Sequence, residues 1–189
     1  DSLINIKDIG ITLNGALKYN IENAMAACAA LIKLNIDYKY IIQGLKDFSL
    51  NDKDNPGRFN LYNLNGINVV LDYGHNVDGY NKVMEGIKNL NYTRLVGVVG
   101  MPGDRRDEDI VSVGTICGKN FDYLYVKEDR DKRGRKNGEV ANLLIKGMCK
   151  SNFNKENINI VLDEKQALKK AIKCAKKGDL IVAFFEEYE

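Results

Sequence analysis

Apolar residues follow two different periodicities along the chain, and the first is helical. From Tyr19 onward they recur at three- and four-residue steps, which predicts an amphipathic helix with Asn20 as its cap. A second helix is predicted over residues 38–48. Residues 1–17 are short, β-prone and interrupted by glycines. This first part therefore predicts two helices after a segment that buries little by itself.

A polar run ends the helical pattern. Residues 49–55 carry no apolar periodicity and lead into a Pro-Gly pair. We therefore predict a domain boundary here, with one unit over residues 1–53 and another over residues 54–189.

The second unit follows the pattern of an α/β protein. Asn65-Gly66 separates two strand-like runs at 59–64 and 67–73, and this pair favours a type I′ hairpin because both residues tolerate positive φ. Amphipathic helices and apolar strands then alternate, with helices at 77–89, 108–119, 138–149 and 164–176 and strands at 95–99, 123–126, 158–162 and 180–185. The pattern predicts a Rossmann-like, mostly parallel sheet with an initial β-hairpin, covered by helices on both faces.

Three polar loops follow successive predicted strands. They span residues 72–76, 100–107 and 127–135 and are rich in glycine and charge. Because parallel strands end at the same edge of a sheet, and ligands of such sheets bind there, we expect the three loops to form one binding edge.

Composition excludes several classes of protein. The formal charge is +2 with 29% charged residues of both signs, so no excess charge favours nucleic acid or a membrane surface. No apolar run approaches the roughly 20 residues of a membrane helix, and no signal-like leader opens the chain. A soluble, cytoplasmic protein is expected.

The cysteines and the single histidine do not indicate a metal site or a disulfide. The four cysteines are far apart, lie in predicted helices and are expected to be buried free thiols: Cys28, Cys117, Cys149 and Cys174. With one histidine and no CxxC pair, a zinc site would lack ligands. No metal ligand is predicted in this chain, and Mg²⁺ would enter with a phosphate ligand.

The first loop and the turn before the hairpin carry the sharpest candidates. Arg58 follows a Pro-Gly turn and could bind phosphate or a base; otherwise it is a surface arginine. Asp72 ends a strand, where a carboxylate can bind ribose hydroxyls or simply cap the turn. His75 could contact phosphate, transfer a proton, or be merely exposed. Together they favour a nucleotide as the ligand.

The other two loops favour anions and charged substrates. Residues 100–107 place glycines and two arginines at a helix start, which attracts anions, while Asp107 could cap that helix. Residues 127–135 alternate in sign, as a solvated loop also does. The chain has no phosphate-binding P-loop and no Gly-x-Ser-x-Gly nucleophile motif. By itself it lacks a complete catalytic apparatus.

These motifs together resemble the Mur ligase superfamily. Arg58 with Asp72-Tyr73-Gly74-His75-Asn76 resembles the start of its C-terminal domain, although Gly74 and Val77 stand where alanine and proline are more usual, and residues 19–24 resemble the end of its central ATPase domain. Residues 103–109 with 127–129 and 133–135 resemble the cyanophycin synthetases within it. The resemblance covers nearly the whole chain.

The resemblance implies a site and an activity. ATP would activate a carboxylate as an acyl phosphate, and arginine would be joined to aspartate side chains of a poly-aspartate backbone. Asn23 would lie near adenine with Asn20 in support, Arg58 near the phosphates, Asp72 at the ribose, and His75 beside them as the catalytic residue. The P-loop, the Mg²⁺ ligands and an ATP-grasp domain would lie upstream. Residues 1–53 would then be the end of the ATPase domain, the isolated fragment would be inactive, and the full-length protein would be a homo-oligomer.

Charge alone suggests which residues hold the amine substrate. A guanidinium prefers carboxylates, and a substrate carboxylate prefers arginine. The predicted substrate-binding residues are Asp104, Arg105, Arg106, Glu108, Asp109, Glu128 and Asp129.

Other functions remain open from the sequence. A folylpolyglutamate or peptidoglycan ligase fragment would need cationic pockets for acidic amino acids, which the acids of the last two loops disfavour. A stand-alone nucleotide-binding module would be complete as it is. Nucleic-acid binding has only the 127–135 run in its favour. Whether arginine or lysine is the amine is also open.

Overall fold

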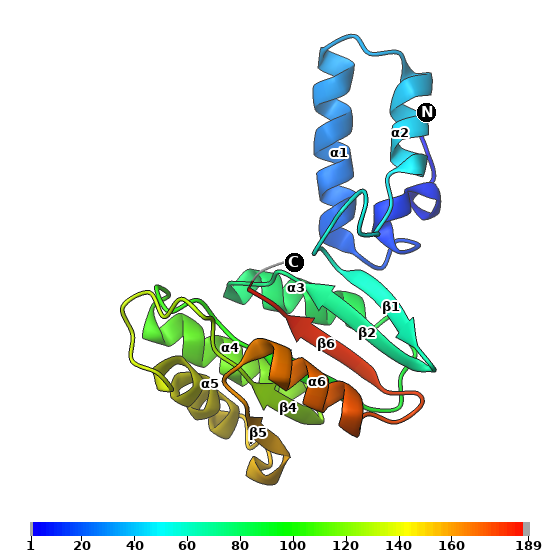
Figure 1. Cartoon of the computed structure of the whole chain (residues 1–189). Helices are drawn as coiled ribbons and strands as arrows, with labels where there is room; N and C mark the ends of the chain where they lie inside the picture. Colours follow the sequence, from blue (N-terminus) through cyan, green and yellow to red (C-terminus); the bar gives the residue numbers. More distant parts are fainter. Residues whose placement is uncertain (1, 187–189) are drawn as a thin grey trace.

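The computed structural model describes residues 2–186, as a helical hairpin followed by an α/β sheet domain (Figure 1). The hairpin consists of α1 (Lys18–Lys33) and α2 (Tyr38–Asp47), and it projects from the sheet domain. The predicted pair of helices is confirmed. Exposed apolar side chains cover much of this hairpin: Met25, Leu31, Ile32, Leu34, Ile36, Tyr38 and Tyr40.

The segment before α1 is not extended. It forms 3-10 turns at Ile6–Asp8 and Gly10–Thr12. The Asn5 side chain accepts the Lys7 amide at 2.9 Å, and the Thr12 hydroxyl lies 2.9 Å from the carbonyls of both Ile6 and Ile9. The β-prone prediction was wrong here because these local side-chain bonds satisfy the backbone without a strand partner.

Helix α1 begins before its predicted cap. It starts at Lys18 after Leu17, which makes no side-chain capping bond. Asn20 lies inside the helix, is buried, and donates its amide to the Ile11 carbonyl at 2.7 Å. The capping prediction for Asn20 was therefore wrong, and this side chain ties α1 to the preceding turn.

Among the described residues, six strands form one sheet in the order β1-β2-β6-β3-β4-β5. Only the β1–β2 pair is antiparallel; its turn has φ of 53° at Asn65 and 88° at Gly66, as a type I′ hairpin requires. The strands are β1 (Asn60–Leu64), β2 (Ile67–Asp72), β3 (Leu95–Val99), β4 (Tyr123–Val126), β5 (Ile158–Ile160) and β6 (Leu180–Phe184). The predicted α/β, mostly parallel sheet with an initial hairpin is confirmed.

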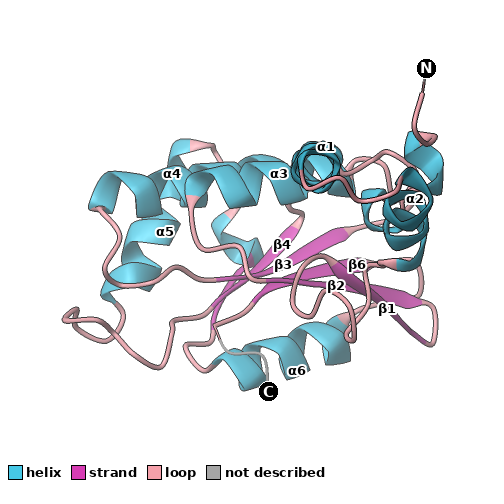
Figure 2. Cartoon of the chain, turned by 90° about the horizontal axis from the view of Figure 1, so that it is seen from above, coloured by secondary structure: helices cyan, strands magenta, loops and turns pink. Residues whose placement is uncertain are grey.

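Helices cover the two faces of the sheet unequally (Figure 2). One face carries α3 (Val77–Ile87), α4 (Asp107–Asn120) and α5 (Glu139–Lys150), and the other carries α6 (Glu164–Cys174). The larger core includes Phe59, Tyr80 and Leu144. Helices α4 and α5 pack closely because a Cβ on Gly147 would lie 2.9 Å from the Gly114 Cα. No helix among residues 2–186 is both long and apolar enough to cross a bilayer.

The cysteines differ in burial. Cys117 is buried in α4, and burial raises the pKa of its thiol. Cys28 and Cys149 are half-buried and Cys174 is exposed, all as free thiols. The prediction of buried thiols thus holds for Cys117 and is wrong for the other three, which lie at partly or fully exposed helix positions.

Candidate functional site

The carboxyl ends of the parallel strands gather the three predicted loops on one edge of the sheet. Strands β2, β6, β3 and β4 are adjacent and parallel, so Asp72, Phe184, Val99 and Val126 end at the same edge. Asp72 at the end of β2, Asp104 after β3 and Asp129 after β4 therefore all lie at that edge, as the sequence predicted. Three hollows lie along it and share lining residues.

The first hollow, here the Asp72 cavity, has a volume of about 170 Å³. Its lining comes from α1, from the turn before β1, from the loop after β2 and from α3: Tyr19, Arg58, Asp72, Tyr73, Gly74, His75, Asn76, Asp78, Gly79, Lys82 and Val83. The structure thus brings the predicted Arg58, Asp72 and His75 together. Tyr19 and Lys82 join them, although the sequence analysis did not select either.

Asp72 is the buried acid of this cavity, with 6% of its surface exposed. Its carboxylate accepts the Phe59 amide at 2.9 Å. Burial raises the pKa of Asp72 to about 6, even though the Phe59 and Gly74 amides and the nearby Arg58 and His75 favour the charged form. Among residues 2–186 no cation forms a salt bridge with this carboxylate, which leaves a ligand free to supply further donors.

Aromatic and cationic groups surround Asp72. The Arg58 guanidinium lies 5.7 Å from the centre of the Tyr73 ring, and the rings of Tyr73 and His75 are 5.2 Å apart. His75 Nδ1 is 3.0 Å from the Tyr73 carbonyl, so that nitrogen carries the proton and donates it. This leaves His75 Nε2 to interact with a ligand.

Two predicted nucleotide residues lie apart from this cavity. Asn20 is buried, and the exposed Asn23 lies one turn further along α1, with its amide nitrogen 3.4 Å from the Asn20 side-chain oxygen. Neither lines the Asp72 cavity. Their contact with adenine stays a prediction.

The loop after β3 divides the predicted substrate residues into two groups. Arg105 donates to the His75 carbonyl at 3.3 Å, and Asp104 pairs with Arg133 at 3.0 Å. Arg106 and Asp109 instead pair with each other at 2.9 Å. Both Arg106 and Glu108 are exposed to solvent. Only the first part of the loop is therefore tied to the site.

The start of α4 differs from its prediction. Arg106 occupies the N-cap position without a side-chain capping bond, and Asp107 is the first helical residue. The capping prediction for Asp107 was wrong because its carboxylate accepts Arg135 at 2.8 Å. Arg135 also donates to the carbonyls of Gly103 and Arg105, at 2.6 and 2.7 Å, and so joins the second loop to the third.

Glu128 and Asp129 already have partners inside the chain. Glu128 is 3% exposed and accepts the amides of Gly138 and Ala141, both at 2.9 Å, at the start of α5. Burial opposes its charge, but these bonds and Lys132 together lower the pKa of Glu128. Asp129, 5% exposed, pairs with Lys127 at 2.8 Å. Their role in binding the amine stays a prediction.

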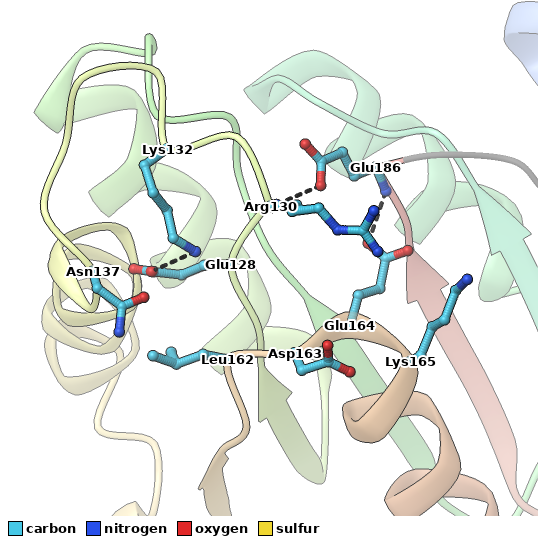
Figure 3. Close-up of a pocket in the computed structure, with 9 residues that line it drawn as sticks. All are labelled: Glu128, Arg130, Lys132, Asn137, Leu162, Asp163, Glu164, Lys165 and Glu186. Carbon is cyan, nitrogen blue, oxygen red and sulfur yellow. Dashed lines mark hydrogen bonds and ion pairs between the residues drawn. The ribbon is translucent and has the colours of Figure 1, made fainter.

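The second hollow, here the Glu164 cavity, lies at the other end of the edge (Figure 3) and has a volume of about 280 Å³. It is lined by Glu128, Arg130, Lys132, Asn137, Leu162, Asp163, Glu164, Lys165 and Glu186. Of these, the sequence analysis selected only Glu128. The order of parallel strands could have revealed the rest, because the ends of β5 and β6 must also reach this edge.

A narrow cleft connects the two cavities. It shares Tyr73, Gly74 and His75 with the Asp72 cavity and Glu186 with the Glu164 cavity. Lys127 and Asp129 form its wall between them. Across residues 2–186, no group of three or more His, Cys, Asp or Glu side chains is placed to hold a metal ion.

Comparison with known proteins identifies the family. Residues 57–184 match the model described as "Mur ligase, glutamate ligase domain". Cyanophycin synthetases of Crocosphaera subtropica and Synechocystis sp. are each 42% identical to the chain, over 95% and 94% of it and 20% of their own length. A UDP-N-acetylmuramoyl-L-alanyl-D-glutamate–2,6-diaminopimelate ligase of Clostridium acetobutylicum is 32% identical over 91% of the chain and 34% of its own length. The chain thus spans about one fifth of the cyanophycin synthetases.

Solved structures support the fold. Escherichia coli FolC in complex with ADP has a TM-score of 0.66 and 23% identity, covering 85% of this chain and 35% of that one. The MurC ligase of Thermotoga maritima has a TM-score of 0.62 and 18% identity, covering 89% and 35%. The resemblance to the cyanophycin synthetases is confirmed, and the chain belongs to the Mur ligase family.

Proposed function

We propose that this chain is the C-terminal region of an ATP-dependent ligase that forms amide bonds, with an activity like that of the cyanophycin synthetases. The observation that carries this proposal is the single edge that joins the Asp72 cavity to the Glu164 cavity. One end offers an unfilled carboxylate with an arginine and a histidine, and the other offers charges of both signs. A nucleotide and an amino acid fit these two ends.

Residues 1–53 would be the end of the preceding ATPase domain. Met25 and Leu34 are 67% and 70% exposed on the projecting hairpin, which is costly for a surface that stays in water. The family's longer members provide the sequence that could cover it, since the chain spans 20% of its cyanophycin synthetase relatives. The P-loop and the Mg²⁺ ligands would lie in that additional part of the longer proteins.

At the nucleotide end, Asp72 would accept the ribose hydroxyls. Arg58 would bind phosphate oxygens through its planar fork, and His75 Nε2 would lie beside them. Arg58 is exposed, its guanidinium faces the Tyr73 ring, and it takes part in no salt bridge among residues 2–186, so its donors are available. This end therefore binds ATP only when the ATPase domain supplies the phosphate cradle.

The chemistry would proceed in two steps. The substrate carboxylate attacks the γ-phosphorus of ATP, which forms an acyl phosphate and releases ADP. The amino group then attacks the acyl carbon, the C–O bond to phosphate breaks, and the nitrogen loses a proton as phosphate leaves. His75 is positioned to hold a proton near the phosphates, and closure of this domain would exclude water from the acyl phosphate.

At the amine end, arginine would enter with its α-amino group toward the connecting cleft. The exposed Arg130 and Lys165, with the predicted Arg105, are candidates to bind its carboxylate. The poly-aspartate chain would reach the cleft from the upstream domains. The isolated chain would be inactive, because it lacks a phosphate cradle.

The test uses the longer protein that contains this chain. We expect ATP-dependent incorporation of arginine into an aspartate polymer with release of one ADP and one phosphate per arginine, and loss of most activity in Arg58→Met. Lysine, glutamate and diaminopimelate, supplied in parallel with their own acceptors, distinguish the sister ligases. Release of ADP without any incorporated amine would contradict the proposal.

Calorimetry separates this proposal from a stand-alone nucleotide-binding module. The 189-residue chain alone should bind ATP weakly, since its Asp72 cavity is about 170 Å³ and lacks a phosphate cradle. Tight binding without the upstream domains would favour the module.

A further inference from the structure

A buried lysine lies between the two cavities and has no part in the chemistry above. Lys127, only 2% exposed, directly follows β4. Its ammonium is 2.8 Å from an Asp129 oxygen and 2.7 Å from Glu164 Oε2. A buried charge is costly unless it is paired, and here one carboxylate from the same loop, Asp129, and one from the distant start of α6, Glu164, pair with it. Lys127 therefore joins the end of β4 to the start of α6.

The path of the lysine side chain depends on Gly100. A Cβ at that position would lie 2.5 Å from Lys127 Cε and 2.8 Å from Cδ. The lysine stem thus crosses the end of β3 directly against the backbone, where little room is left for another conformation. The ammonium is held in place by packing as well as by its ion pairs.

Lys127 holds one carboxylate oxygen of Glu164, and the Glu164 side chain lines the Glu164 cavity. Its Oε2 accepts hydrogen bonds from the Lys127 ammonium and from the Glu186 backbone amide, the latter at 2.8 Å (this hydrogen bond is drawn in Figure 3). Within residues 2–186 every partner of this carboxylate is on Oε2, and its side chain is 25% exposed. Oε1 is therefore the atom that a ligand in the cavity can reach.

Lys127 by itself does not balance the carboxylates around Glu164, and Arg130 and Lys165, which also line the cavity, form no salt bridge with Glu164 among the described residues. Lys127 faces two carboxylates, so one ammonium is shared between two negative charges. Lys132, in the same cavity, pairs with Glu128 at 3.3 Å. A cationic group that enters the cavity would meet a fixed carboxylate whose neighbours already hold it in one orientation.

We propose that Glu164 determines specificity for an amine with a cationic side chain, and that Lys127 is the positioning residue that holds Glu164. This inference rests on the proposed function. A guanidinium would donate to Oε1, whereas a neutral side chain of the same shape would leave that oxygen without a charged partner. Specificity arises because the site is already built for the charge before the substrate enters.

The test compares L-arginine with L-citrulline, whose side chain has nearly the same shape and no charge, in the longer protein. Glu164→Gln should lower the preference in kcat/KM for arginine over citrulline by about 10- to 100-fold, the worth of a hydrogen bond to a charged group. The KM for ATP should not change. Glu164→Asp keeps the negative charge on a side chain that is one methylene shorter, and it should retain part of the preference for arginine.

Glu156→Gln is the matched control. It removes one carboxylate from the turn Lys155–Asn157, just before β5 and away from the carboxyl edge, and should leave the preference intact. Gly100→Ala tests Lys127 without removing any charge, because it displaces the lysine stem, and it should lower the preference in the same direction as Glu164→Gln.

The outcomes separate the two proposals. If the wild-type protein incorporates arginine with ATP but Glu164→Gln keeps the full preference, the specificity role is overturned and the proposed function stands. If Gly100→Ala is folded and active with an unchanged preference, Lys127 does not position Glu164. If the wild-type protein incorporates no amine with ATP, the proposed function itself fails.

Discussion

Two buried aspartates at opposite edges of the sheet differ in how fully their carboxylates are paired with donors from the chain. At the amino edge, Asp179 is 1% exposed, accepts the Arg94 guanidinium on both oxygens and accepts the Lys176 amide at 2.7 Å. At the carboxyl edge, Asp72 is 6% exposed and has a nearby arginine that does not bond to it. One carboxylate is saturated, and the other is not.

The pKa values of the two aspartates are therefore shifted in opposite directions. The hydrogen bond from Arg94 outweighs burial and lowers the pKa of Asp179. Burial outweighs the partners of Asp72 and raises its pKa to about 6. An acid that folding leaves short of partners is a better candidate for ligand binding than one that folding has fully paired.

The largest expected effect comes from breaking the saturated pair. Arg94→Met should lower the free energy of unfolding by about 3–5 kcal/mol, because Asp179 would remain buried without its cation. Urea unfolding at pH 7 measures this. Arg58→Met is the matched control at the other edge and should change stability little, since Arg58 is exposed. Equal effects of the two variants would contradict the comparison.

A smaller effect should appear in the pH dependence of stability. Because the folded-state pKa of Asp72 is raised from 3.8 to about 6, the folded state binds this proton more tightly than the unfolded state. The stabilisation is complete below pH 3.8 and is lost as pH rises through about 6, by up to about 3 kcal/mol.

Asp72→Asn removes this titration. Compared with the wild type, its free energy of unfolding should therefore be relatively higher at pH 7 than at pH 4, as urea unfolding at both values would show. Asp179→Asn should show the opposite trend in a lower pH window, because the lowered pKa of Asp179 stabilises the wild-type fold above pH 3.8 and this stabilisation is lost as pH falls below that value. Urea unfolding of this variant and the wild type at about pH 5 and about pH 2 measures it. If the free energy of unfolding of both variants, relative to the wild type, changed in the same direction with pH, the proposed difference between the two aspartates would be wrong.

The smallest effects concern two glycines. Gly100→Ala should lower the free energy of unfolding by about 1–3 kcal/mol, because the new Cβ would crowd the Lys127 stem. Gly44→Ala in α2 is the control: nothing lies within 4 Å of its Cβ, and it should raise stability by up to about 1 kcal/mol. Thermal unfolding of both variants in one buffer measures the difference; a stabilised Gly100→Ala would mean that Lys127 is not held there.

Most of the fold follows from the sequence. The alternation of strands and helices, the Asn65-Gly66 hairpin and the shared edge of the three loops were all predicted and are present. The failures were local: Thr12 and Asn20 form side-chain bonds to backbone that apolar periodicity does not register.

The candidate site was less predictable. Arg58, Asp72 and His75 share a cavity as expected, but Glu164 was treated only as the start of a helix. Its partner Lys127 is 37 residues earlier in the chain, and the amide it accepts belongs to Glu186. No spacing rule links these three positions, because α5 and β5 separate the first from the second, and α6 and β6 separate the second from the third.

By itself the sequence determined the order of elements, the parallel sheet and the edge at which ligands can bind, because these depend on local periodicity and on the geometry of parallel strands. Only the tertiary structure decided which charges are paired and which are available. Glu128 became a partner of α5, Asp179 a partner of Arg94, while Asp72 was left short of partners. The physical reason is that a carboxylate's role depends on burial and on donors from distant segments, which only folding brings together.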